Sequence, residues 1–363
     1  MNRLYDKTLV SDIQRKQRTT VDSAGLVTML KPIPDDDRQN VLDPRVLQIA
    51  AKKKEVHKHI SFAPKYSLRA QRYRPDKINY DLTETEVVED EVLIPINNDH
   101  LIDAFFCSQP STRKDRPAMI FLHGGGFTAG DYGLYRNSMR FLAEKSGGVI
   151  IFPEYRLAPE NPFPCGLDDC WGTITWVYEN AETLGIDANK IMVAGDSAGG
   201  NLSLACEIRD ENRIVKELFL LYPSVDSTPL DKLAGYSWSY DQYPVIEEHK
   251  ELAVNRIERI KSGGGTLGNI YLQGRTDYKD PFISPVYYNN LDKFPRTIIA
   301  AAEYDFLRLG SDHFARLLKQ QNVDVQNVQY LGCDHGFLDG LGIVPQAEEI
   351  CLFMADELQN LGK

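Results

Sequence analysis

A serine flanked by glycines, in the motif Gly195-Asp196-Ser197-Ala198-Gly199, is the first feature of this sequence that could do chemistry. An apolar run, 191–194, precedes the motif, and a segment with helical spacing, 201–209, follows it. A serine at a sharp strand-to-helix turn exposes its hydroxyl, and glycines beside it avoid collisions with both elements. The alternative is a glycine-rich helix start whose serine is only a cap. The strand–turn–helix context favours a nucleophile, Ser197.

A second glycine-rich stretch, His123-Gly124-Gly125-Gly126-Phe127, directly follows the apolar run 118–122. Consecutive glycines let backbone N–H groups face a ligand without interference from side chains. Acyl transfer needs such donors, because they stabilise the oxyanion of the tetrahedral intermediate. Alone, the stretch could be a plain flexible loop. Together with the serine motif, it predicts an oxyanion hole.

A serine hydroxyl becomes a good nucleophile only when a base removes its proton. His335 lies on a loop between Gly332 and Gly336, just after the last expected strand. The other six histidines lie elsewhere: His57, His59 and His100 before the expected core, His123 in the glycine stretch, His249 in a long insertion and His313 on an expected helix. The sequence therefore predicts His335 as the base.

The base needs a carboxylate to orient it, at the end of a strand between the serine and the histidine in the chain. Asp305 follows the expected strand 297–302 and meets this condition. Glu303 would still lie at the strand end, and Asp312 is expected to cap the next helix. Asp334 adjoins His335 and is badly placed to reach the far nitrogen of its ring. Asp305 is the predicted acid.

Short apolar runs that alternate with helical segments indicate parallel strands covered on both faces. A hairpin, Glu91–Ile96 and Leu101–Cys107, comes first. Six runs follow: Ala118–Leu122, Gly148–Phe152, Ile191–Ala194, Leu218–Tyr222, Thr297–Ala302 and Val325–Tyr330. The expected fold is therefore α/β, with a mostly parallel, eight-stranded sheet flanked by helices.

Two regions stand outside this alternation. Residues 1–85 are polar and proline-rich, with one expected helix, Val46–His59. Its Lys52-Lys53-Lys54 run and the pair His57/His59 could suggest a phosphate or metal site, but a solvated helical face is favoured because no Cys or carboxylate cluster completes a metal set. The second region, 227–295, is far longer than an ordinary loop. It contains an expected helix, Val245–Ile260, and an aromatic cluster of Tyr236, Trp238, Tyr240 and Tyr243.

Composition limits the possible partners. The formal net charge of −11 opposes binding to nucleic acid or anionic lipid, and no stretch approaches the roughly 18 apolar residues of a membrane span. The six cysteines, 107, 165, 170, 206, 333 and 351, have no Cys-x-x-Cys spacing and are expected to be buried thiols. With no apolar run behind the first residues, no signal peptide is expected, and the simplest location is cytoplasmic.

These motifs together resemble the hormone-sensitive-lipase-like branch of the α/β-hydrolases, which contains many microbial carboxylesterases. The resemblance covers roughly residues 85–360 and rests on the following residues: His123–Phe127, Tyr155-Arg156-Leu157-Ala158-Pro159-Glu160, Phe163-Pro164, Asp168-Asp169, Gly195–Asn201, Asp305 and His335. Two departures are Phe306, where many relatives have proline after the triad aspartate, and an insertion longer than usual.

The resemblance implies roles for several backbone groups. The N–H groups of Gly125, Gly126 and Ala198 would hold the oxyanion, and His123 with Gly124 would support the glycine loop. It also implies a division of the chain. Residues 86–226 and 296–363 would form the catalytic core, while 227–295 and the N-terminal segment 1–85 would form a helical cap over the active site.

The expected function is that of a serine carboxylesterase, which hydrolyses short-chain carboxylic esters through an acyl-enzyme. Its partner would be a small-molecule ester, no metal or organic cofactor is needed, and homo-oligomerisation stays open. A prolyl-type serine peptidase is one alternative, but such enzymes usually carry a propeller with blades of about 40 to 50 residues, which residues 1–85 cannot hold. A non-catalytic hydrolase-like binding protein is the other, and loss of the triad histidine would favour it.

Overall fold

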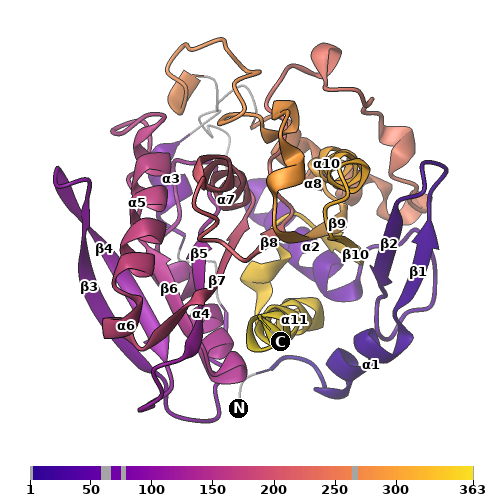
Figure 1. Ribbon diagram of the computed structural model, residues 1–363. Helices are drawn as coiled ribbons and strands as arrows, with labels where there is room; N and C mark the ends of the chain where they lie inside the picture. The colour runs from indigo at the N-terminus through magenta and orange to yellow at the C-terminus, as the bar shows by residue number, and fades with distance from the viewer. Residues whose placement is uncertain (1–2, 59–66, 75–78, 264–268, 363) are drawn as a thin grey trace.

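A twisted sheet of ten strands forms the centre of the molecule (Figure 1). The structure is a computed structural model that describes residues 3–58, 67–74, 79–263 and 269–362. The strand order across the sheet is β1-β2-β10-β9-β8-β7-β5-β6-β4-β3. The strands are β1 Arg18–Val21, β2 Val27–Lys31, β3 Val88–Ile96, β4 His100–Ser108, β5 Arg116–Leu122, β6 Val149–Pro153, β7 Ile186–Asp196, β8 Glu217–Leu221, β9 Arg296–Tyr304 and β10 Val325–Asp334.

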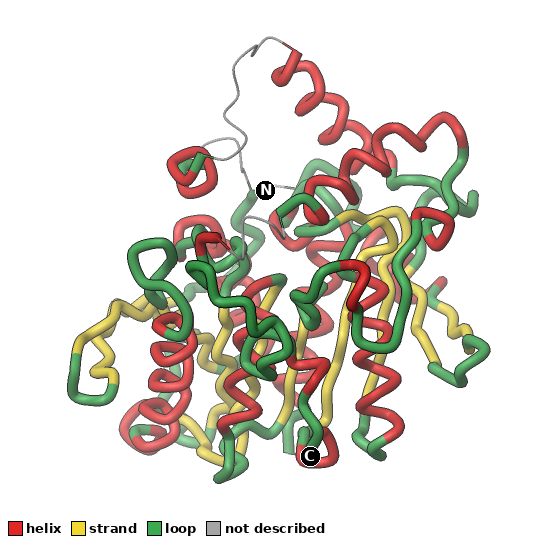
Figure 2. Tube along the Cα trace, turned by 90° about the horizontal axis from the view of Figure 1, so that it is seen from above, coloured by secondary structure: helices red, strands yellow, loops and turns green. Residues whose placement is uncertain are grey.

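All pairings from β2 through β10, β9, β8, β7 and β5 to β6 are parallel, whereas β3 and β4 add an antiparallel hairpin at one edge. The predicted α/β class and mostly parallel sheet are confirmed, and the eight predicted strands correspond to β3–β10. The sheet has two further strands, β1 and β2, which form a hairpin on the far edge beside β10. Figure 2 shows the two hairpins at opposite ends of the molecule.

Helices cover both faces of the sheet. The α-helices are α1 Thr8–Lys16, α2 Pro44–Lys58, α3 Leu68–Arg72, α4 Tyr132–Ser146, α5 Cys165–Glu179, α6 Ala181–Leu184, α7 Ala198–Arg209, α8 Glu247–Lys261, α10 Arg308–Gln320 and α11 Pro345–Asn360. Short 3₁₀ turns are η1 Leu230–Lys232, η2 Tyr240–Gln242, η3 Pro285–Tyr287, η4 Leu291–Lys293 and η5 Phe337–Gly340. Successive residues of β5 point to opposite faces: Ile120 packs with the α5, α7 and α10 side, and Phe121 with the α4 and α11 side.

The insertion between β8 and β9 has two parts. Its helix α8 packs with α2 of the N-terminal region in a separate cluster, in which Leu42, Val46, Ala253 and Ile257 are buried. The later part, with Tyr271 and other buried apolar residues, joins the hydrophobic core on the α5 and α7 side. Residues 1–85 are likewise divided, because β1 and β2 belong to the sheet while α2 packs on α8.

Some expectations for the N-terminal helix lie outside what the structure describes. The predicted helix Val46–His59 corresponds to α2, but the side chains of Lys52–Lys54 and His57, and the whole of His59, are outside the described residues. Five of the six cysteines are buried free thiols, as expected, and Cys165 is only half-buried.

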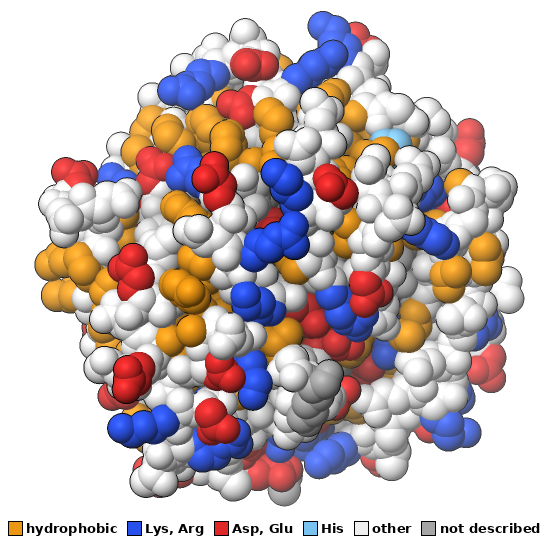
Figure 3. All heavy atoms as spheres, in the orientation of Figure 1, with side chains coloured by type: hydrophobic (Ala, Val, Ile, Leu, Met, Phe, Trp, Pro, Cys, Tyr) orange, Lys and Arg blue, Asp and Glu red, His pale blue; other side chains and the backbone are white. Residues whose placement is uncertain are grey.

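The surface mixes charges of both signs. Figure 3 shows acidic and basic side chains interspersed over one face, with apolar atoms exposed between them. Within the ranges that the structure describes, no helix has both the length and the apolar character needed to cross a bilayer.

Candidate active site

Ser197 lies on the turn that joins β7 to α7, in strained backbone with φ of 56° and ψ of −114°. The strained turn is possible because Gly199 has no side chain. A Cβ at Gly199 would lie 1.8 Å from the carbonyl oxygen of Leu122, at the end of the neighbouring strand β5. A non-glycine residue with positive φ is uncommon and is a recognised feature of active sites. The predicted strand–turn–helix context of the serine motif is therefore present in the structure.

The structure brings Ser197, His335 and Asp305 together, although they are far apart in the chain. His335 Nε2 lies 2.9 Å from Ser197 Oγ, and His335 Nδ1 lies 2.7 Å from Asp305 Oδ2. In the neutral imidazole with its proton on Nδ1, the ring donates to Asp305 and accepts from the serine hydroxyl. This arrangement can remove the serine proton and place it on a ring that a carboxylate orients.

Buried contacts hold this series in place. The Asp305 side chain is fully buried, and its Oδ1 accepts a hydrogen bond of 2.9 Å from the backbone N–H of Leu307. The Tyr243 hydroxyl, from the insertion, donates to the backbone carbonyl of Asp305 at 2.9 Å. The ring of Tyr222, directly after β8, packs edge-on against the His335 imidazole with centroids 4.8 Å apart. Both aromatic contacts were absent from the sequence-based expectation.

The glycine loop begins at the carboxyl end of β5, beside the serine turn. Gly125 has φ of 123°, and a Cβ there would lie 2.0 Å from the Ala129 carbonyl oxygen, so only glycine is suited to the position. Within the described part of the chain, the backbone N–H groups of Gly125, Gly126 and Ala198 donate to no protein group. These three donors can therefore serve a substrate oxyanion.

Asp196 ties the glycine loop to the serine turn, a role that the sequence alone did not reveal. Its Oδ1 accepts a hydrogen bond of 2.6 Å from the Gly124 N–H, and its Oδ2 accepts one of 3.1 Å from the Tyr135 hydroxyl. A Cβ at Gly124 would lie 2.5 Å from that Oδ2. The Gly124 N–H is thus occupied and sets the position of the loop, while the next two N–H groups along the loop stay available.

His123 supports the glycine loop through its buried side chain. Its buried ring stacks on Tyr155 with centroids 4.2 Å apart, and its Nδ1 lies 2.8 Å from the Gly124 carbonyl oxygen. Burial lowers the pKa of His123 to about 4, because the charged form would lose its hydration. The ring is therefore neutral near pH 7, and Nδ1–H donates to the Gly124 carbonyl.

Comparison with known proteins places this geometry in a family. A family model described as the alpha/beta hydrolase fold matches residues 119–339, which include the serine turn, the glycine loop, Asp305 and His335. The chain belongs to the α/β-hydrolase family. The relatives indicate its branch, the hormone-sensitive-lipase-like carboxylesterases.

This α/β-hydrolase is similar to several esterases. It is 32% identical to the esterase LipI of Mycobacterium tuberculosis over 65% of this chain and 70% of that protein, and 30% identical to the carboxylesterase NlhH of the same organism over 66% and 72%. The solved structure of the Pyrobaculum calidifontis esterase matches with a TM-score of 0.72 and 27% identity, over 88% of this chain and 98% of that one. Together these matches identify a carboxylic ester hydrolase.

The other carboxylates near His335 in this hydrolase have different partners. Glu303 Oε2 accepts from the Gly332 N–H at 2.7 Å, and burial raises the pKa of the Glu303 side chain. Asp334 forms an ion pair with Arg256 of α8. The expectation that Asp312 caps the next helix is wrong, because α10 already begins at Arg308 and Asp312 lies inside it.

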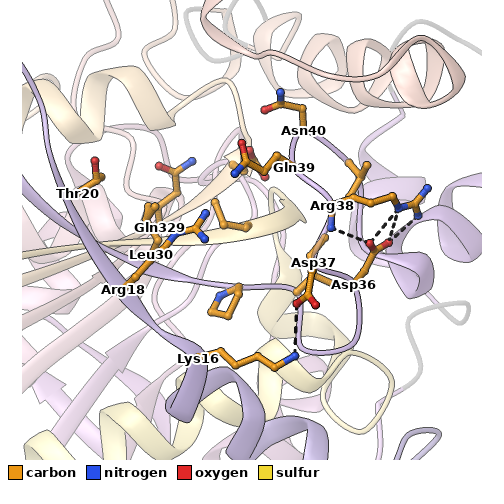
Figure 4. Close-up of a pocket in the computed structure, with 15 residues that line it drawn as sticks. Lys16, Arg18, Thr20, Leu30, Asp36, Asp37, Arg38, Gln39, Asn40 and Gln329 are labelled. Carbon is orange, nitrogen blue, oxygen red and sulfur yellow. Dashed lines mark hydrogen bonds and ion pairs between the residues drawn. The ribbon is translucent and has the colours of Figure 1, made fainter.

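A cavity of about 740 Å³ lies between residues 36–41 and the end of the sheet formed by β1, β2 and β10 (Figure 4). None of Ser197, Asp305 and His335 lines it. Its charged side chains partly neutralise one another, since Lys16 pairs with Asp37 at 3.5 Å and Asp36 with Arg38 at 2.6 Å. The group formed by Ser197, His335 and Asp305 therefore lies outside this cavity.

Asp305→Asn should lower ester turnover by roughly 10⁴-fold, because an amide at the Oδ2 position favours the wrong tautomer of His335. Asp312→Asn is the matched control. Its carboxyl accepts from Asn327 at 3.0 Å and is held by burial at a raised pKa, so the same chemical change there should leave turnover within a few-fold of wild type. Steady-state kinetics on a soluble ester would measure both. If the two variants exchanged phenotypes, Asp305 would not be the acid.

Proposed function

We propose that this carboxylic ester hydrolase acts through an acyl-enzyme formed on Ser197. In this mechanism Ser197 Oγ attacks the ester carbonyl while His335 Nε2 takes the hydroxyl proton, and Asp305 stabilises the imidazolium. His335 then donates that proton to the departing alcohol. A water molecule next attacks the acyl-enzyme with His335 as base, which releases the acid and restores the serine. The observation that carries the proposal is the hydrogen-bond series Asp305–His335–Ser197, at 2.7 and 2.9 Å.

The oxyanion of both tetrahedral intermediates would be held by the backbone N–H groups of Gly125, Gly126 and Ala198. Their supporting feature is the position of Gly124: its own N–H is used by Asp196, which holds the loop beside the serine turn. Donors that are already oriented need no reorganisation as charge develops, and this makes them effective in the transition state. No metal or organic cofactor enters any of these steps.

We further propose that 86–226 and 296–363 form the catalytic core and that 227–295, with part of 1–85, covers the active site and limits the length of the acyl chain. The cap makes direct contact with the triad loops. Trp238 packs on Phe306, the residue after Asp305, with centroids 5.3 Å apart, and its Nε1 donates to the Tyr243 hydroxyl at 3.1 Å. A cap that rests on the loops carrying Asp305 and His335 leaves little space for a long chain. A preference for short acyl chains, roughly C2 to C6, follows.

Ser197→Ala should abolish ester hydrolysis while the protein stays folded, because a triad without its nucleophile typically loses about 10⁶-fold in turnover. Hydrolysis of a short-chain nitrophenyl ester would be followed by absorbance, with circular dichroism as the check of folding. The exposed Ser11→Ala on α1 is the control and should keep wild-type activity. Retention of more than a few per cent of activity by purified Ser197→Ala would exclude Ser197 as the nucleophile.

The rate profile across acyl lengths should peak between C2 and C6 and fall beyond. Each methylene left outside a filled pocket forgoes about 0.8 kcal/mol of binding. Trp238 contacts Tyr240, Tyr243 and Phe306 and lies beneath the Lys261 ammonium at 4.8 Å, which supports a place in the core of the cap. Trp238→Ala should therefore lower Tm without extending the profile. A wild-type rate that rises through C12, with activation at an oil interface, would contradict the short-chain proposal.

A further inference from the structure

We propose that Arg256, on the cap helix α8, is a positioning residue for His335. It acts through Asp334, the residue before His335, whose negative charge it neutralises. The inference rests on the proposed role of His335 as the base. It adds an electrostatic link between the cap and the reaction, because the cap helix then controls the charge next to the base.

Two arginines on successive turns of α8 contact two successive residues of the loop that carries the base. Arg256 Nε donates to Asp334 Oδ2 in an ion pair. Arg259 Nη2 donates to the backbone carbonyl of His335 at 3.4 Å. The Arg256 and Asp334 side chains are only 13% and 7% exposed, so solvent screens this pair weakly. Residues three apart on a helix share one face, which explains how one helix reaches both positions.

The helix that carries these arginines is itself fixed in place. Ala253 and Ile257 of α8 are buried against Leu42 and Val46 of the N-terminal region. His249, one turn earlier, accepts a hydrogen bond of 3.1 Å from the Leu42 N–H at its Nδ1. Because its apolar face is anchored independently, α8 can present Arg256 to Asp334 at a constant position.

Charge explains why Arg256 matters for the reaction. Asp334 directly precedes His335, and a carboxylate with no countercharge there would favour the protonated imidazole, which cannot act as a base. The guanidinium of Arg256 offsets that charge. Within the described residues, the charged and polar groups around His335 are Ser197, Tyr222 and Asp305 from the core, Asp334 and Asp339 from its own segment, and Arg256 and Arg259 from α8, with Arg74 near Arg259.

The test is the pH dependence of kcat/KM on a soluble short-chain ester, because its acid limb reports the base in the free enzyme. Arg256→Met leaves Asp334 without its countercharge and should move the acid limb to higher pH, by roughly half to one unit. Asp334→Asn leaves Arg256 without its carboxylate and should move the limb the opposite way, to lower pH. Arg256→Lys should stay near wild type, and Arg256→Met combined with Asp334→Asn should return the limb toward the wild-type position.

The matched control is Lys250→Met, which removes the same charge from α8 where Lys250 pairs with the exposed Glu247. It should leave the acid limb unchanged. Displacements of opposite sign for Arg256→Met and Asp334→Asn support the proposal. Equal displacements, or none, overturn it, because a purely structural contact would lower activity in both variants without separating their pH limbs. If Arg256→Met fails to fold, the sign of the Asp334→Asn displacement decides.

The activity of Ser197→Ala distinguishes a failure of the proposed mechanism from a failure of the role given to Arg256. If Ser197→Ala remains active, the triad mechanism itself is wrong. If Ser197→Ala is inactive and the pH limbs of the Arg256 and Asp334 variants do not diverge, the triad stands and only the role of Arg256 is lost.

Discussion

The hydrogen-bond series from Asp305 through His335 to Ser197 is the interaction on which the rest of the structure depends. Its three residues come from the carboxyl ends of three strands, β7, β9 and β10, which are parallel and close to one another in the sheet. Parallel strands end at the same edge, so side chains far apart in the chain can meet there. The sheet must hold them within hydrogen-bond distance, and the buried carboxylate of Asp305 depends on the N–H of Leu307 and on the ring it orients.

Neighbouring groups fix the segments on either side of that hydrogen-bond series. The glycines of the serine turn permit strained backbone at Ser197, and Asp196 fixes the loop that carries the N–H groups of Gly125 and Gly126. The insertion 227–295 lies on the other side, where the Tyr243 hydroxyl donates to the carbonyl of Asp305 and α8 contacts the His335 loop. The insertion is therefore in contact with the segments that carry Asp305 and His335.

The features that could be predicted from the sequence are those with a local signal. The serine motif, the glycine loop and the apolar runs identified β3–β10 and predicted that the three triad residues would meet. The strand β1 was missed because it is exposed along its whole length, and β2 because its buried positions are the polar residues Thr28 and Lys31. Asp312 was misplaced because α10 begins at Arg308 without a side-chain cap at Leu307, so the true helix start carries no sequence signal.

The contacts of Asp196, Tyr222 and Arg256 could not be predicted for a different reason. They join segments far apart in the chain, such as Arg256 and Asp334, and only the packed fold brings those segments together. The same limit applies to residues 1–85 and 227–295, which are divided between the sheet, the main core and the α2–α8 cluster. Polar, irregular sequence carries no local signal that predicts which surface it packs against.

Covalent labelling tests the central claim most directly. A fluorophosphonate probe forms a stable bond only with a serine whose hydroxyl is activated by a base. Intact-protein mass spectrometry should find one adduct per chain, and peptide mapping should place it on Ser197, with no adduct in Ser197→Ala. An adduct on another residue, or an active enzyme that the probe does not modify, would contradict the account.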